Sequence, residues 1–336
     1  MADPHDPGFA SAGEIGASVA GVAREAIQIA RGGRVLVGTA SWTDPTMTKK
    51  GVFYPPEATS AEDRLRYYAE QFPVVEVDAT YYALPRPDQS KLWVERTPDD
   101  FVMDVKAHAL MTGQPSEVKR LPRELRDALP KELAEKPRVY GKDLPGELLD
   151  GVWETFKRGV EPLRKSGKLG AVFLQFPRWV FPSHEARQQI LQAQERLGDR
   201  RLTVEFRHGS WFNEKNAERT LRFLSDHRVP YVIVDEPQGF KSSVPPVTVV
   251  TDPDLAVFRF HGRRQDTWEK PNIPPNERFR YLYDEDELAD AAARVADVAR
   301  SAHETHVLMN NCAGNYGTTN AAQLADLLAQ YQAGSH

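Results

Sequence analysis

Eight short apolar segments, separated by helical patterns and each ending in polar residues, constrain the fold of this chain more than any other feature. The segments are Val35–Ser41, Val74–Asp78, Phe101–His108, Gly170–Phe176, Leu202–Trp211, Pro230–Asp235, Val257–Arg263 and His306–Asn311. Alternating strands and helices are typical of parallel sheets, and the sites of (β/α)8 barrels lie at the C-terminal ends of the strands. The pattern therefore predicts an α/β fold of the (β/α)8 TIM-barrel class, with its site at the polar strand ends.

The sequence before the first strand predicts an addition to the barrel. Residues 1–32 combine a polar tail with an extra helix, because apolar residues recur at helical spacing from Ile15 to Ile29 and end at two glycines. Residues 33–331 then form the predicted barrel, followed by a short tail at residues 332–336.

A long segment after strand three interrupts the alternation. Residues 113–168 contain thirteen basic and ten acidic residues and delay the fourth strand. Their apolar spacing predicts helices at Leu121–Leu133 and Leu144–Leu163, so we expect a helical insertion at the face where substrates bind. Mixed charge on helices is also typical of a solvated surface, and both interpretations stay open.

Composition excludes several classes of protein. The formal net charge of −5 gives no overall attraction for a polyanion, so any anion site must be local. No apolar run approaches the ~20 residues that span a bilayer, so we expect no membrane segment. One cysteine, Cys312, excludes an intrachain disulfide, and with an acidic N-terminus it favours the cytoplasm.

A dozen short motifs occur in order between about residue 35 and residue 331. They include Val37–Trp42, Phe53–Pro55, Val75–Tyr82, Leu84–Pro85, Thr97–Phe101, Val105–Lys106, Val204–Trp211, Phe260–Arg263 and Asn310–Asn311 with Tyr316. Together they resemble the YecE-like family, domain of unknown function 72. The resemblance implies a barrel whose strand ends carry these motifs, and it implies no particular reaction.

The chain departs from the family pattern in three places. Asp78 stands where the strand-two motif usually has Asn, and Cys312 stands where the last motif usually has Asp. The insertion at residues 113–168 is also longer than usual. These departures bear on the substrate more than on the architecture.

Strand phase indicates which polar residues converge, because side chains alternate between the two faces of a strand. Glu76 shares a face with Asp78, Asp104 with Lys106 and His108, Glu205 with Arg207, and Arg259 with His261 and Arg263. The deeper members need partners, since an unpaired buried charge is costly, and an internal ion pair of Asp104 with Arg259 is one expectation. The outer members are the candidate site.

The candidate catalytic residues are Glu76, Glu205, His261 and Lys106. The candidate substrate-binding residues are Ser41, Trp42, Asp78, Tyr81, Gln175, Arg207, Trp211, Asp235, Arg263, Asn310 and Asn311. Carboxylates on strands two and five suit general acid and base catalysis, and the cations around them suit a phosphate. We therefore expect a hydrolase for a phosphate-bearing substrate, with a nucleic-acid phosphodiester as one candidate.

Two other functions fit the same residues. A pair of carboxylates across a barrel also cleaves glycosidic bonds, with Trp42 and Trp211 stacked on sugar rings, and a sugar-binding barrel needs only the stacking. A non-catalytic protein that binds anions or nucleic acid would need the cations without the two carboxylates.

Metal binding stays open as well. Glu76, Glu205, Asp235 and His261 provide oxygen ligands and one imidazole, a set that suits Mn, Mg or Zn. The sequence contains no compact metal motif and no nucleotide-cofactor motif.

Residues 262–283 and Cys312 each allow two interpretations. The stretch 262–283 has five basic residues, three acidic residues and four aromatic residues, which suits single-stranded nucleic acid. The alternative is a loop that Trp268 and Tyr281 attach to the barrel. Cys312 is either a nucleophile or, as a lone thiol without a neighbouring motif, a packed residue.

Overall fold

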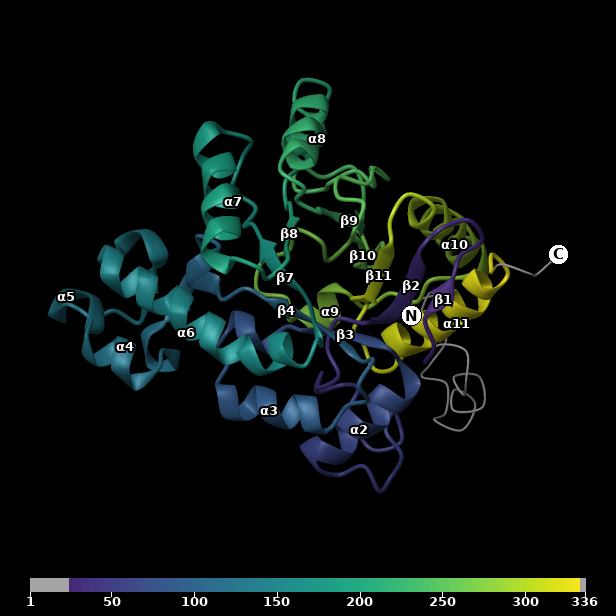
Figure 1. Ribbon diagram of the computed structural model, residues 1–336, viewed down its shortest axis with the longest axis horizontal. Coiled ribbons are helices and arrows are strands. Elements are labelled where there is room, and N and C mark those ends of the chain that lie inside the picture. Colours follow the sequence, from purple (N-terminus) through teal and green to yellow (C-terminus); the bar gives the residue numbers. More distant parts are fainter. Residues whose placement is uncertain (1–23, 333–336) are drawn as a thin grey trace. The chain divides into compact units, whose positions relative to one another are not determined.

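The computed structural model describes residues 24–332 (Figure 1). The chain divides into two compact units. One unit comprises the chain up to Glu76 together with Gly209 onward, and the other comprises Val77–His208. Within residues 24–332, eight parallel strands alternate with helices, in a mixed α/β fold of the TIM-barrel type that the sequence predicts.

The first unit contains five parallel strands in the order β3-β2-β11-β10-β9. Their bounds are Arg34–Thr39 (β2), Val74–Val77 (β3), Val232–Asp235 (β9), Ala256–Phe260 (β10) and Glu304–Met309 (β11). All five lie inside or within two residues of the predicted segments. Their side chains are almost entirely buried, as expected for parallel strands covered on both faces.

Two of the helices described in this unit begin at a capping box. They are α2 (Ala61–Gln71), α8 (Ala217–Asp226), α9 (Pro275–Arg278), α10 (Glu285–Ala299) and α11 (Tyr316–Ala329), with one 3-10 turn at Gly209–Phe212. Ser60 and Asp63 form a capping box at the start of α2, and Asp284 and Glu287 form another at α10. Helices α10 and α11 pack against each other beside β11 (Figure 1).

The predicted N-terminal helix is wrong where the structure describes it. Ile27–Gln28 form a short strand, β1, which pairs antiparallel with β2, and Ile29 makes a bridge to Gln332. Both Ile27 and Ile29 are 1% exposed, so partners far along the chain outweigh the local helical spacing. The rest of the predicted tail and helix, residues 1–23, lies outside the described residues, as do residues 333–336.

The second unit contains three parallel strands in the order β4-β7-β8. They are Val102–Lys106 (β4), Leu169–Gln175 (β7) and Leu202–Glu205 (β8). The helices that accompany them are α3 (Pro87–Glu95), α6 (Gly146–Lys165) and α7 (His184–Leu197), and the Ser183 side chain caps α7. Helix α6 packs on α3 and leads into β7, so it connects two parallel strands as a β/α helix does.

The remainder of the insertion differs from the prediction. The expected helix Leu121–Leu133 is two short helices, α4 (Arg123–Asp127) and α5 (Lys131–Ala134), because Pro130 precedes the second. A two-stranded antiparallel sheet of β5 (Pro115–Glu117) and β6 (Arg138–Tyr140) was not predicted. The 3-10 turns of this unit lie at Ala79–Tyr81 (η1), Ala109–Met111 (η2), Val118–Arg120 (η3) and Gly141–Asp143 (η4).

Candidate functional site

The C-terminal ends of β4, β7 and β8 bring four of the predicted site residues to one face of the second unit. In the strand register, Lys106 lies beside Phe173, Phe173 beside Thr203, and Gln175 beside Glu205. Paired residues on neighbouring parallel strands point the same way, and so do residues two apart on one strand. Lys106, Gln175, Glu205 and Arg207 therefore share a face, and we call these four residues the strand-end site.

The carboxylate of Glu205 is the centre of the strand-end site. Its side chain is 1% exposed, and Oε1 accepts hydrogen bonds from Gln175 Nε2 (2.8 Å) and from Arg207 Nη1 (3.0 Å). A charged donor and a neutral amide thus fix its position. A carboxylate held in this way has the fixed position that acid-base catalysis or ligand binding requires.

Tyr81 borders the strand-end site from η1. The Lys106 ammonium lies 5.2 Å from the centre of its ring, and its hydroxyl donates to Gln114 Oε1 (2.7 Å). Gln114 in turn donates to the backbone carbonyl of Gln175 (3.1 Å). Burial raises the pKa of Tyr81 to about 12, so it stays a neutral donor at physiological pH. Asp78 lies half-buried at the start of the same turn.

Two exposed aromatic rings follow β7, and the sequence prediction missed them. Trp179 is 57% exposed and Phe181 is 53% exposed. The Phe181 ring meets the His208 ring edge to face at a centroid distance of 4.6 Å. Exposed aromatic rings beside strand ends can stack on a base or on a sugar ring. No spacing rule in the sequence distinguishes them from the buried aromatic residues.

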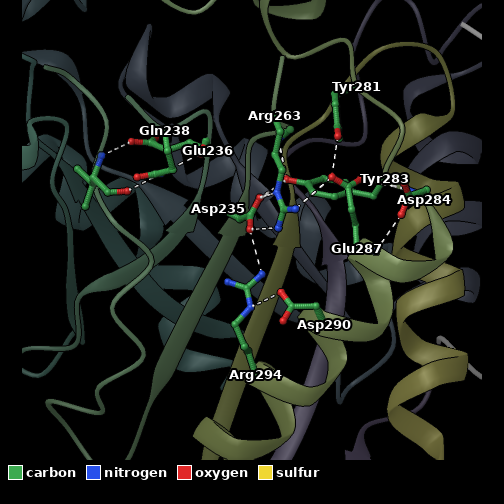
Figure 2. A network of polar contacts seen from close by, with 12 residues as sticks. Asp235, Glu236, Gln238, Arg263, Tyr281, Tyr283, Asp284, Glu287, Asp290 and Arg294 are labelled. Atoms are coloured by element: carbon green, nitrogen blue, oxygen red, sulfur yellow. Dashed lines mark hydrogen bonds and ion pairs between the residues drawn. The ribbon is translucent and has the colours of Figure 1, made fainter. Parts of the chain in front are cut away.

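A second polar cluster surrounds Asp235 at the end of β9 in the first unit. Figure 2 shows Arg263 and Arg294 reaching its carboxylate from two sides. Arg263 Nε and Nη2 donate to Asp235 at 2.9 and 2.8 Å, Arg294 Nη2 at 3.0 Å, and the Tyr283 hydroxyl at 2.9 Å. The sequence prediction paired Asp235 and Arg263 in one site but missed Arg294 and Tyr283.

The Asp235 cluster has no excess positive charge. Arg263 also pairs with Glu287 at 3.1 Å, and Arg294 pairs with Asp290 at 3.0 Å, so three carboxylates face two guanidinium groups. Burial alone would raise the pKa of Asp235, but hydrogen bonds and positive charge from the two arginines hold that pKa below its usual value. A cleft of about 400 Å³ adjoins the cluster. The charge balance disfavours a phosphate there and favours a structural role.

Glu76 lies in a buried ion pair. Its carboxylate is 0% exposed and lies 2.7 Å from Nε of Arg259, which is 2% exposed. Because the carboxylate and its guanidinium partner are both withdrawn from solvent, whereas the Arg207 partner of Glu205 is 12% exposed, this placement favours a structural role for Glu76 over the catalytic role expected from the sequence. The expected pair of Asp104 with Arg259 stays a prediction.

His261 is buried beside Asn310. Asn310 Nδ2 lies 2.8 Å from His261 Nδ1, which must then accept, so the neutral ring carries its proton on Nε2. The Phe279 ring stacks on the imidazole at a centroid distance of 5.5 Å. Asn311 is also buried and donates to the Tyr281 carbonyl and to Asn320 Oδ1. The structure thus brings His261 and Asn310 together, within the packing of the loop that follows β10.

The two tryptophans expected to stack on a sugar are packed instead. Trp42 is 7% exposed and Trp211 is 0% exposed. Ser41, at the end of β2, has a φ of +136°, a conformation that non-glycine residues rarely adopt, and its hydroxyl accepts from the Thr43 backbone N–H.

Residues 262–283 form a loop attached to the barrel, as one of the two interpretations expects. Trp268 is 1% exposed and donates from Nε1 to the Ser242 hydroxyl, and Tyr281 donates to Glu287. Arg278 donates to backbone carbonyls of the loop itself. The rings of Trp268 and Tyr283 are therefore turned inward and cannot stack on a nucleic-acid strand.

The sequence leaves metal binding open, with Glu76, Glu205, Asp235 and His261 as candidates. Across residues 24–332, no group of three or more His, Cys, Asp or Glu side chains is arranged to hold a metal ion. The thiol of Cys312 is half-buried. In the same residues, no helix is long and apolar enough to cross a membrane.

Comparisons with known proteins support the family resemblance that the sequence motifs indicate. The sequence matches the family described as "Protein of unknown function DUF72" over residues 36–335. It is 30% identical to the UPF0759 protein YunF of Bacillus subtilis over 297 residues, which cover 88% of this chain and 94% of YunF. It is 34% identical to the UPF0759 protein YecE of Escherichia coli over 80 residues, which cover 24% of this chain and 26% of YecE.

A solved structure extends the likeness to the fold. A DUF72 family protein from Thermotoga maritima is 30% identical, with a TM-score of 0.67 over 88% of this chain and 98% of the other. The family match and the identity to YunF extend over most of the sequence. The chain therefore belongs to the DUF72 family.

Proposed function

We propose that this protein is a hydrolase that cleaves a phosphate ester at the strand-end site. The observation that carries the proposal is the Glu205 carboxylate, which Gln175 and Arg207 hold at the end of β8. The ammonium of Lys106 lies on the same face of the three strands. Strand register puts Lys106 two strand spacings from Thr203, and Glu205 lies two residues further along β8. The Cα atoms of Lys106 and Glu205 are therefore roughly 12 Å apart, which leaves room for a phosphate.

In the proposed reaction, Glu205 acts as the general base. Its carboxylate takes a proton from a water molecule, and the oxygen of that water attacks the phosphorus. The bond from phosphorus to the ester oxygen breaks, and the leaving oxygen receives a proton from water. Lys106 and Arg207 offset the negative charge that grows on the phosphate oxygens. A guanidinium has five N–H donors, so Arg207 can hold Glu205 and still face a phosphate oxygen.

A nucleic-acid strand is the substrate that the surroundings support best. Trp179 and Phe181 are exposed next to β7, and the Phe181 ring meets His208, close in sequence to Arg207. Aromatic rings beside cations hold single strands without reading their sequence. We also propose a cytoplasmic location, which the single cysteine supports.

Sugar binding is the second candidate, and one observation favours it. The same exposed rings of Trp179 and Phe181 are suited to stacking on a pyranose. A neutral sugar would make no use of the positive charges of Lys106 and Arg207, which is why the phosphate proposal comes first.

The test is a hydrolysis screen of wild-type protein and Glu205→Gln. The substrates are a nitrophenyl phosphodiester, 5′-labelled single-stranded DNA and RNA, and nitrophenyl glycosides. We expect phosphodiester cleavage by the wild type and a loss of at least ~100-fold in Glu205→Gln, since a positioned base contributes ~10²–10⁴-fold. The matched control is Glu147→Gln, the same change at an exposed position of α6, which should keep full activity. Cleavage of glycosides alone, or equal rates in the two variants, would refute the proposal.

A further inference from the structure

Basic side chains of the inserted segment between β4 and α6 gather around one cleft. Residues 113–145 contain eight basic and six acidic residues, so the segment is nearly balanced. A cleft of about 730 Å³ lies in it, and the cations Lys119, Arg126, Lys136 and Arg138 line this cleft. Among the described residues that line it, Glu117 is the only acid. The fold thus gathers positive charge that the composition of the segment does not reveal.

The β5–β6 hairpin explains why Glu117 and Arg138 lie on one face. Glu117 pairs with Arg138 across the hairpin, while the preceding pair, Ser116 with Val139, is buried. Because side chains alternate along a strand, burying Ser116 and Val139 turns Glu117 and Arg138 to the other face.

One carboxylate serves three cations at this face. Glu117 lies 3.0 Å from Arg120, 3.5 Å from Lys119 and 3.7 Å from Arg138. Partial burial raises the pKa of Glu117, but the Arg120 hydrogen bond and the charge of Lys119 outweigh this and lower it, so Glu117 stays ionised near neutral pH. One negative charge cannot neutralise three positive ones, and Lys119 and Arg138 are 79% and 64% exposed. A surplus of positive charge therefore faces solvent.

A second cleft, of about 280 Å³, adjoins the first. It shares Glu117 and Arg138 with it and is also lined by Tyr81, Tyr82 and Arg120. The Tyr82 ring is 48% exposed, and the Arg120 guanidinium lies 5.8 Å from its centre. Tyr81 is the ring beside Lys106, so cations and aromatic rings continue from the strand-end site into the insertion. We call the two clefts together the insertion groove.

We infer that the insertion groove binds the phosphate backbone of a single-stranded nucleic acid that runs to the strand-end site. The part of this inference that leads the nucleic acid to the strand-end site rests on the proposed function. Surplus cations suit the phosphates, and the exposed Tyr82 ring suits a base. A small phosphate ester would not need the two adjoining clefts or their five lining cations, so the inference narrows the substrate to a strand.

The test is the salt dependence of the affinity for a labelled twelve-nucleotide single strand. Fluorescence anisotropy measures this affinity at each salt concentration. For single strands, the slope of log affinity against log salt changes by about 0.7 for each phosphate contact. Removing Lys119, Arg126, Lys136 and Arg138 together, each as a change to Gln, should reduce the slope by up to about 2.8. Lys119→Gln with Lys136→Gln should reduce it by about 1.4.

The matched control changes two cations of the same segment that do not line the groove. Arg123→Gln with Lys131→Gln removes the same net charge as Lys119→Gln with Lys136→Gln, and the Arg123 side chain is 85% exposed. This control should leave the slope almost unchanged. The inference would be overturned if the salt slope fell equally in the control and groove variants, or if it did not fall in the groove variants. It would also be overturned if the groove variants lost affinity for polyglutamate, a polyanion without phosphates or bases, as much as for the strand. Unchanged thermal melting of each variant shows that it folds.

Turnover separates this inference from the proposed function. Glu205→Gln should bind the strand with the full salt slope but not cleave it, and the control Arg123→Gln with Lys131→Gln should keep both the slope and the cleavage. If no substrate is cleaved while the groove variants still lose the slope, the proposed hydrolysis fails and the binding groove stands. If cleavage depends on Glu205 while the groove variants keep the slope, the groove inference fails alone.

Discussion

Replacing Asp235 with Asn should destabilise the protein strongly, because this buried carboxylate ties β9 to the loop after β10 and to α10. It accepts two hydrogen bonds from Arg263, one from Arg294 and one from the Tyr283 hydroxyl. Asn keeps the shape but replaces one accepting oxygen with an NH2 group, which would face Nη2 of both arginines. Each charged hydrogen bond is worth about 1.5–3 kcal/mol, so losing two gives about 3–6 kcal/mol. The arginine side chains are 34% and 21% exposed and regain some hydration, which favours the lower end, near ~3 kcal/mol.

Urea unfolding at 25 °C measures this loss, and its pH dependence tests the cause. Because the pKa of Asp235 is lowered from an ordinary value of 3.8, its contribution is present above that value and is lost as the pH falls through the folded-state pKa. The stability gap between wild type and Asp235→Asn should therefore be full at neutral pH and shrink below about pH 4. The matched control is Asp290→Asn, whose side chain is 63% exposed and pairs with Arg294 alone in this cluster, and which should cost less than about 1 kcal/mol. Equal losses in the two variants, or a gap that persists in acid, would refute the reasoning.

Two further predictions concern a buried pair and an exposed pair. Glu76→Gln leaves the buried Arg259 without its carboxylate and should destabilise the protein by about 3–5 kcal/mol in urea unfolding; a loss below about 1 kcal/mol would contradict a structural role. Trp179→Ala and Phe181→Ala should each weaken single-strand binding by about 1–3 kcal/mol in an anisotropy titration, without a change in melting temperature. Leu92→Ala, at a side chain 42% exposed on α3, is the control, and equal effects of all three substitutions would argue against stacking.

The strands and most helices could be predicted because their signals are local. An apolar run such as Val74–Val77 and a capping box such as Ser60 with Asp63 identify themselves within a few residues. Strand β1 could not be predicted, because its partners are on β2 and at Gln332. The hairpin of β5 and β6 could not be predicted for the same reason, because each strand has only three residues and twenty residues separate them.

The candidate site was predictable to the extent that strand phase determines it. The alternation of side chains correctly put Glu205 with Arg207 on one face, and register adds Lys106. Phase does not reveal which cations neutralise which acids. Arg294 reaches Asp235 from fifty-nine residues away, and no spacing in the sequence signals this contact. The sequence does not reveal the solvent exposure of a side chain either, since a tryptophan motif cannot show that Trp211 is packed and Trp179 is exposed.

The measurement that tests the central claim most directly is the affinity of a single-stranded pentanucleotide for wild type, Arg207→Gln and Lys165→Gln at one salt concentration. Lys165, 71% exposed at the end of α6, is the matched control for lost charge. A phosphate held at the strand-end site predicts a loss of about 1.5–3 kcal/mol, roughly 10–100-fold, for Arg207→Gln. The Lys165→Gln protein should bind within about twofold of wild type, since one exposed charge far from the ligand contributes little. Equal affinities of all three proteins, or binding of neutral sugars alone, would contradict the account.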